Sequence, residues 1–304
     1  MEPLSRLRRV RSWLVKQLHV RSKRDAKDLV FKIMVAVAAL ASISPFFLVL
    51  VELLSLAVPV LAREGLSFFS TTPGPNLQGG ILNAIVGTGC VVAIACAVGI
   101  PLSVLGAVYI SEYSRPGLVR ATVEFAADVL AGIPSIVFGA FGFVFLVVYM
   151  KIGMGMLAGG LTLAFMMIPT VLRTTQEALR QVPLSLREAS LALGATKWTT
   201  TWMVTIRSAL PGVITGVLLA VGRVMGETAP LIFTAGNSVS LPTTFTGPGS
   251  WIASMPFTVW AYISDPRSYL QEKAHATAFT LLVMVLLVDL LANYLSRKFT
   301  RRLA

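Results

Sequence analysis

The sequence is poor in cysteine and histidine, with two of each in 304 residues. Cys90 and Cys96 lie six positions apart in one apolar run, and His19 and His275 are isolated. A zinc site needs several Cys or His ligands at close spacing, and a disulfide scaffold needs more cysteines. Both classes are therefore excluded, and we expect the two cysteines to be small buried hydrophobic residues.

Charged residues are also scarce. They make up 13% of the chain, whereas soluble domains carry about 25%, and 55% of the residues are hydrophobic. The charges cluster and leave long uncharged runs. This pattern predicts an all-α polytopic membrane protein and disfavours a single large soluble core.

Catalytic and nucleotide-binding motifs are missing. No G-x-x-x-x-G-K-[ST] sequence occurs, so the chain has no P-loop with which to bind ATP. Outside one charged span, described below, there are no paired intramembrane carboxylates and no Ser/His/Asp arrangement. We expect a protein that is not an enzyme and has no cofactor of its own, with a membrane enzyme as a distant alternative.

The net charge of +12 follows the membrane topology. Six apolar runs can span a bilayer; they cover approximately residues 30–61, 81–111, 126–150, 154–172, 209–234 and 277–296. If the N-terminus is inside, 21 of the 26 Lys and Arg residues lie on the inner side. The positive-inside rule then makes both termini cytoplasmic, and no RNA- or DNA-binding motif supports a nucleic-acid partner. We predict a basic cytoplasmic tail over residues 1–29 and a transmembrane domain over residues 30–304.

A cytoplasmic loop over residues 173–208 contains helix-forming sequence. Pro183 precedes a short amphipathic segment, Ser185 can cap its start, and Gly194 can end it with a left-handed turn. The simplest interpretation is an amphipathic helix lying on the membrane.

The sequence REASLALGATKW in this loop resembles the "EAA" motif of bacterial ABC-importer permeases. Glu188, Ala189 and Gly194 match the motif, and Ser190 takes the place of its second alanine. The resemblance implies a coupling helix that docks on a separate ATPase subunit. Downstream, the chain departs from the family pattern, because Ile206 and Arg207 replace a Leu-Pro pair.

The span over residues 209–234 carries two charges, in the sequence GRVMGETAPL. On a helical wheel Arg223 and Glu227 share a glycine-rich face, opposite a bulky face of Val, Ile and Met that we expect to contact lipid. Pro230 would leave the Gly226 carbonyl without its helical hydrogen bond. The pair can be a structural staple or an anion site, because a guanidinium binds phosphate or carboxylate in a bidentate manner.

GRVMGETAPL, LAGIPSIVFG and WAYISDP together resemble the PstA-type phosphate permease family, over most of the chain beyond residue 80. The resemblance implies an ABC type I importer permease fold and makes Arg223 and Glu227 transport residues. The GIPS sequence, with Gly132, Pro134 and Ser135, is interpreted as a turn that bends a helix and lines a cavity, and Pro230 as a second helix-bending residue.

The family also implies the surroundings of the chain. They are a bacterial inner or plasma membrane, a homologous PstC-type permease, two PstB-type ATPase subunits that bind ATP and Mg²⁺, a PstS-type extracytoplasmic binding protein, and inorganic phosphate as substrate. Two alternatives stay open. One is a permease for sulfate or molybdate, and the other is an ion-gradient-driven transporter or channel that needs no ATPase.

Overall fold

The computed structural model describes residues 23–247 and 249–301. These residues form helices and contain no strand, with one isolated bridge between Pro73 and Gly79, so the all-α prediction is confirmed. The chain divides into one unit that ends at Ser55 and a second that begins at Leu56. Most of the basic tail predicted over residues 1–29 lies outside the described residues, and its last part is already helical from Lys23.

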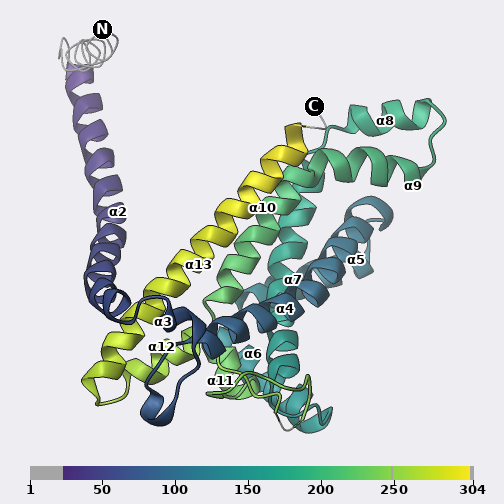
Figure 1. The fold of residues 1–304 in the computed structure, drawn as a ribbon. Helices are drawn as coiled ribbons and strands as arrows, with labels where there is room; N and C mark the ends of the chain where they lie inside the picture. The colour runs from purple at the N-terminus through teal and green to yellow at the C-terminus, as the bar shows by residue number, and fades with distance from the viewer. Residues whose placement is uncertain (1–22, 248, 302–304) are drawn as a thin grey trace. The chain divides into compact units, whose positions relative to one another are not determined.

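Five described helical segments are long and apolar enough to cross a membrane, and a bent pair of helices makes up to six (Figure 1). The five are built from α2 (Lys23–Glu64), α4 (Leu82–Val108) with the π-helical turn η2 (Tyr109–Tyr113), α7 (Met156–Arg180), α10 (Ile206–Met225) and α13 (Ser268–Arg301). Short elements join them: α3 (Ser67–Ser70), η1 (Pro75–Leu77), α8 (Leu184–Ala192), α9 (Lys197–Thr200), π-helical η4 (Thr201–Thr205), α11 (Ala229–Thr234) and α12 (Met255–Ile263).

The span predicted over residues 126–150 is not one continuous helix, and it bends at the GIPS sequence, where a helix-bending turn was expected. The chain forms α5 (Leu118–Gly132), then turns by 105° into α6 (Ser135–Gly142) and the π-helical segment η3 (Phe143–Tyr149). Ile133 is extended, as expected before a proline, because the ring of Pro134 disfavours helical geometry at the preceding residue. A helix therefore cannot continue through this point.

Three other predicted boundaries move. The span over 209–234 is interrupted between Met225 and Ala229, so it consists of α10 and the short α11. The loop that was predicted to be cytoplasmic begins at residue 181 instead of 173, because α7 continues to Arg180 with Gln176 and Leu179 buried. The segment between the last two predicted spans, residues 235–276, contains α12 and the start of α13, which begins at Ser268 instead of at residue 277.

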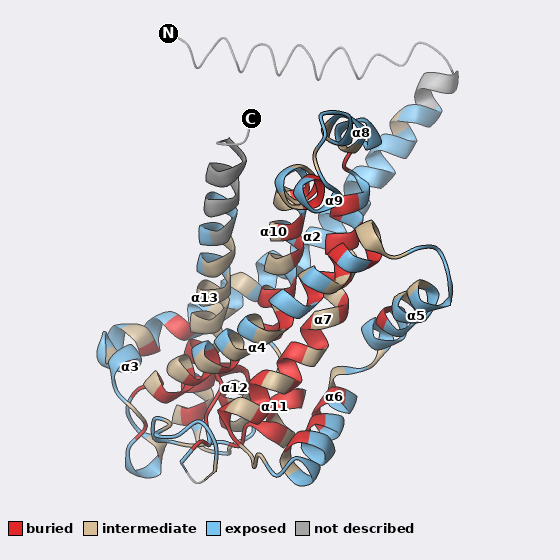
Figure 2. Ribbon diagram, turned by 90° about the vertical axis from the view of Figure 1, so that its right-hand side faces the viewer, coloured by how far each residue is buried: buried red, intermediate tan, exposed pale blue. Residues whose placement is uncertain are grey.

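The core of the second unit is centred on α7, which is mostly buried (Figure 2). Small residues let its neighbours approach closely. Gly99 of α4 lies against Ala164 and Met167, and Gly216 of α10 lies against Thr174. At one end of α7 and α10 lie α8 and α9, and at the other end lie α6 and α11 (Figure 1). In the first unit, the apolar side chains of α2 from Val30 to Val51 are exposed, which suits a helix surrounded by lipid.

Adding a methyl group at Gly216 is expected to destabilise the protein. A Cβ there would lie 2.1 Å from Thr174 Oγ1 and 2.5 Å from Thr174 Cβ, so α10 and α7 would have to separate. Overpacking of this kind lowers the free energy of unfolding by about 1–3 kcal/mol. Thermal unfolding of the purified Gly216→Ala variant measures the loss. Gly89→Ala is the matched control, because no atom lies within 4 Å of its added Cβ, and an equal loss there would contradict the packing argument.

Candidate functional site

The Arg223–Glu227 pair lies where α10 ends. Arg223 is in the last turn of the helix, and Glu227 lies in the break between α10 and α11. Arg223 Nε is 3.7 Å from Glu227 Oε1, with the two side chains 45% and 17% exposed. The predicted ion pair is therefore present, but it is a single long contact. No side-chain hydrogen bond engages Arg223 among the described residues, so most of its five donors are free to bind an anion.

The bulky face of α10 does not point to lipid, and this part of the wheel prediction is wrong. Val213, Val221 and Val224 are buried in the core of the chain. The exposed positions of α10 are on the other side and include Leu219 and Arg223. The valines face inward because their van der Waals contacts with α7 hold the helix in place. The side of α10 that carries Leu219 and Arg223 is therefore left open for a partner or a pathway, although Gly216 of the predicted glycine-rich face packs on α7.

Pro230 has a different role from the predicted one. The chain has already left the α10 helix at Gly226, so Pro230 removes no bond from a continuous helix. It lies in the first turn of α11, a position that tolerates a residue without an N–H, and it is buried. A Cβ on Gly139 of α6 would lie 2.9 Å from Pro230 Cα. The helices that follow the two chain breaks, α6 and α11, are thus in close contact.

The GIPS sequence forms the 105° bend between α5 and α6. Gly132 and Pro134 are exposed and Ser135 is half-buried. A hollow of about 480 Å³ lies beside the bend, lined by Leu130, Ile133, Val137, Phe138, Phe141, Phe145, Phe165 and Ile168. This lining has no polar side chain that could replace the hydration of a phosphate, so the hollow is not suited to hold the substrate.

Asp289 of α13 is an intramembrane carboxylate that the sequence reasoning missed. It is half-buried, and a Cβ on Gly222 would lie 3.6 and 3.7 Å from its two carboxylate oxygens. It therefore faces the residue next to Arg223. Ionisable residues are rare in membrane-spanning helices and tend to be functional, which favours a functional role for Asp289. The available signal was one acidic residue in the apolar run over residues 277–296.

The predicted coupling residues lie on and after α8, at the far end of α10 from Arg223 (Figure 1). Glu188 and Ala189 are exposed, and Ser190 Oγ lies 2.9 Å from Thr200 Oγ1. Gly194 has a φ of 82°, so the predicted left-handed turn is confirmed. The predicted cap by Ser185 is wrong, because Pro183 occupies the N-cap position and no side chain caps the helix.

Arg187 fixes α8 to the rest of the protein and was not identified from the sequence. Its guanidinium donates hydrogen bonds of 2.8 Å to the Leu179 and Val182 carbonyls and pairs with Glu112 of η2 at 3.0 Å. The two charged side chains are only 19% and 11% exposed. The sequence offered only an arginine next to the motif glutamate, and its partner is 75 positions away.

Large apolar side chains are exposed on and around α8. They include Leu184, Leu186, Leu191, Leu193 and, at α9, Trp198. Helices α8 and α9 contain only one buried residue, Thr200. An apolar surface of this kind is typical of a site that another protein covers.

Comparisons with known proteins agree with these features. Residues 99–301 match the family model described as "Binding-protein-dependent transport system inner membrane component". The phosphate transport system permease protein PstA of Pasteurella multocida is 37% identical over 81% of this chain and 85% of its own length. PstA 2 of Mycobacterium tuberculosis is 38% identical over 84% of both chains. The chain belongs to the PstA family.

Solved structures show the fold of this PstA-family chain. A chain of a bacterial alginate ABC transporter superposes with a TM-score of 0.65 at 15% identity, over 90% of this chain and 97% of that one. A chain of the MetNI methionine ABC transporter, in an inward-facing conformation, superposes with a TM-score of 0.54 at 21% identity, over 73% and 94%. The predicted ABC type I importer permease fold is confirmed, and the PstA-family chain is a multi-pass component of the inner membrane.

Proposed function

We infer that this chain is the transmembrane permease subunit of an ATP-driven phosphate importer. The observation that carries the inference is Arg223, an arginine in the last turn of a helix apolar enough to cross the membrane, with free donors on the exposed face of α10, in a chain of the PstA family. Guanidinium groups bind phosphate with bidentate geometry. Arg223 neutralises the anion in transit, and its loose contact with Glu227 lets the donors change partner.

We infer the positions of the remaining subunits from the surfaces that the chain leaves exposed. We propose that a PstC-type permease covers the charged face of α10 and that a PstB-type ATPase contacts the apolar side chains around α8, with a second ATPase on the other permease. A PstS-type protein delivers phosphate at the outer side. ATP and Mg²⁺ bind to the ATPases, so this chain is not catalytic. Both termini lie in the cytoplasm, and residues 30–304 form the permease domain.

Coupling between ATP hydrolysis and transport passes through α8. Closure of the ATPases displaces α8, and Arg187 transmits the displacement to η2 and to the end of α7. Because α10 packs on α7 through Gly216 and Thr174, the movement continues to the helix that carries Arg223. The result is a change in the side of the membrane to which the pathway opens.

Uptake of radiolabelled phosphate tests the function. The chain is expressed with its partner subunits in cells that lack their own phosphate importer. We expect ATP-dependent phosphate uptake that excess sulfate does not inhibit, and an ATPase subunit that co-purifies with the chain. Inhibition by sulfate would favour a permease for another oxyanion. Uptake without an associated ATPase would favour an ion-gradient-driven transporter.

Replacing Glu227 with glutamine is expected to weaken the preference for phosphate over sulfate. At neutral pH phosphate keeps a proton and can donate a hydrogen bond to a carboxylate, whereas sulfate has no proton and is repelled. Glutamine removes the repulsion, and we expect a loss of selectivity of about 10-fold, equivalent to one charged hydrogen bond. Competition between sulfate and labelled phosphate measures the change. Unchanged uptake together with unchanged selectivity would exclude this role for Glu227.

A further inference from the structure

A second basic site lies beside α8, away from Arg223. Three arginines from three elements, Arg120 of α5, Arg180 of α7 and Arg187 of α8, line a hollow of about 400 Å³ together with Ser111 and Glu112 of η2. Each of these elements approaches the hollow from a different part of the chain. Its shape therefore depends on the tertiary fold.

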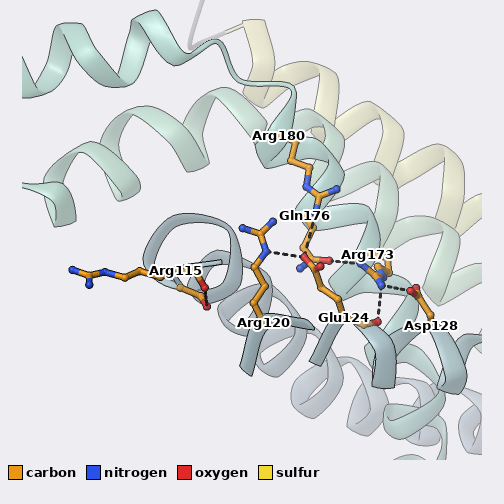
Figure 3. Close-up of polar contacts among 8 residues, drawn as sticks. Arg115, Arg120, Glu124, Asp128, Arg173, Gln176 and Arg180 are labelled. Atoms are coloured by element: carbon orange, nitrogen blue, oxygen red, sulfur yellow. Dashed lines mark hydrogen bonds and ion pairs between the residues drawn. The ribbon is translucent and has the colours of Figure 1, made fainter. Parts of the chain in front are cut away.

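Two carboxylates form ion pairs with these three guanidinium groups. Glu124 Oε1 accepts from Arg120 Nε at 3.1 Å and from Arg180 Nη2 at 3.2 Å, and Glu112 pairs with Arg187. Figure 3 shows Arg120 and Arg180 meeting at Glu124, with the terminal nitrogens of Arg120 pointing away from that carboxylate. The group keeps one positive charge in excess. Asp128 does not offset it, because Arg173 pairs with it at 2.5 Å.

The arginines keep donors for a further ligand. Within the described part of the chain, no residue engages Arg120 Nη1 and Nη2 or Arg180 Nε and Nη1. The two side chains are 27% and 50% exposed, so they are accessible but partly removed from water. Converging guanidinium forks with unused N–H groups match the oxygens of a phosphate group in geometry and charge.

We propose that this hollow binds a phosphate group, carried either by free inorganic phosphate or by an anionic lipid headgroup. The hollow has room for either one. The effect that we propose for this hollow rests on the proposed function, in which α8 is the element that couples to the ATPase. A bound phosphate group would tie α5, α7 and α8 together, and so it would bias the movement of α8. Basic pockets between helices at the cytoplasmic surface are suited to anionic headgroups.

The test uses the complete importer in lipid nanodiscs and measures the midpoint of thermal unfolding. One arm adds inorganic phosphate to discs of phosphatidylcholine, and the other uses discs that contain phosphatidylglycerol without added phosphate. We expect a rise of about 2–4 °C for the wild type in at least one arm, because a ligand that binds only the folded state stabilises it. The arm that responds identifies the source of the phosphate group.

Variants assign the effect to this hollow. The double variant Arg120→Gln with Arg180→Gln should remove the rise in unfolding midpoint. A triple variant that also carries Glu124→Gln leaves no unpaired carboxylate at this position and should remove the rise as well. Arg207→Gln is the matched control, because Arg207 is exposed on α10 and has no partner among the described residues. It should respond like the wild type. No rise in either arm for the wild type, or the same rise in the variants, would overturn the proposal.

Phosphate uptake by the same variants separates the two hypotheses. We expect the variants of the hollow to keep measurable uptake while they lose the shift in unfolding midpoint. If the wild-type importer shows the shift but takes up no phosphate, the proposed function fails and the anion site stands. If it takes up phosphate but its unfolding midpoint does not shift, the anion site fails and the proposed function stands.

Discussion

Replacing Arg223 with alanine is expected to abolish phosphate uptake while the importer still assembles. The side chain is 45% exposed, and its one ionic contact is 3.7 Å long, so the fold depends little on it. Removing a charged partner from a desolvated anion site costs about 2–5 kcal/mol, which reduces uptake by about 30-fold or more. Initial uptake rates in cells, at matched amounts of purified complex, measure the effect.

Two further measurements make this prediction specific. Arg223→Lys keeps the charge but loses the planar fork, so we expect an intermediate rate. If Arg223→Ala instead prevents assembly with the other subunits, the pair with Glu227 is a structural staple. Uptake close to the wild-type rate in an assembled Arg223→Ala complex would remove Arg223 from the transport pathway.

Replacing Arg187 with glutamine is expected to uncouple ATP hydrolysis from transport. The change breaks the 3.0 Å pair with Glu112 and weakens two hydrogen bonds that hold α8 to the end of α7. Breaking a buried pair by removing one partner destabilises a protein by about 3–5 kcal/mol. We expect transport per ATP hydrolysed to fall at least about 10-fold, because α8 then moves without α7. The ratio of uptake to hydrolysis in proteoliposomes gives this number.

The double variant Arg187→Gln with Glu112→Gln separates stability from coupling. It leaves no unpaired buried charge, so thermal stability should recover in large part. The coupling ratio should stay low, because the neutral side chains do not rebuild the attachment of α8. A double variant that recovers both quantities would mean that Arg187 acts only on stability.

Local patterns in the sequence predicted the features that depend on neighbouring residues. The apolar runs located the membrane helices, and the spacing of Arg223 and Glu227 predicted their contact. Gly194 was identified as a left-handed turn because glycine adopts a positive φ without a steric penalty. Each of these inferences needs only a few consecutive residues.

The remaining features depend on tertiary packing. The wheel of α10 could not tell which face meets α7, because bulky valines suit both lipid and a protein core, and Gly216 of the predicted glycine-rich face also packs on α7. Glu112, the ionic partner of Arg187, lies 75 positions away, and Gly222, the residue that Asp289 faces, lies 67 positions away; no periodicity indicates such contacts. The bend at Pro134 had a local signal, but the 105° angle and the contact of α6 with α11 involve residues far apart in the sequence.

The open face of α10 also bears on the lifetime of the protein in the cell. In a copy without the proposed partner subunits, the half-exposed guanidinium of Arg223 has no protein surface to cover it, and a charge that faces lipid is costly. We therefore expect newly made chains to be less stable in the bilayer until that face is covered. We also expect the cellular amount of this chain to fall when the proposed partner subunits are missing. In the proposed importer, Arg223 would then favour complete assemblies as well as bind the anion.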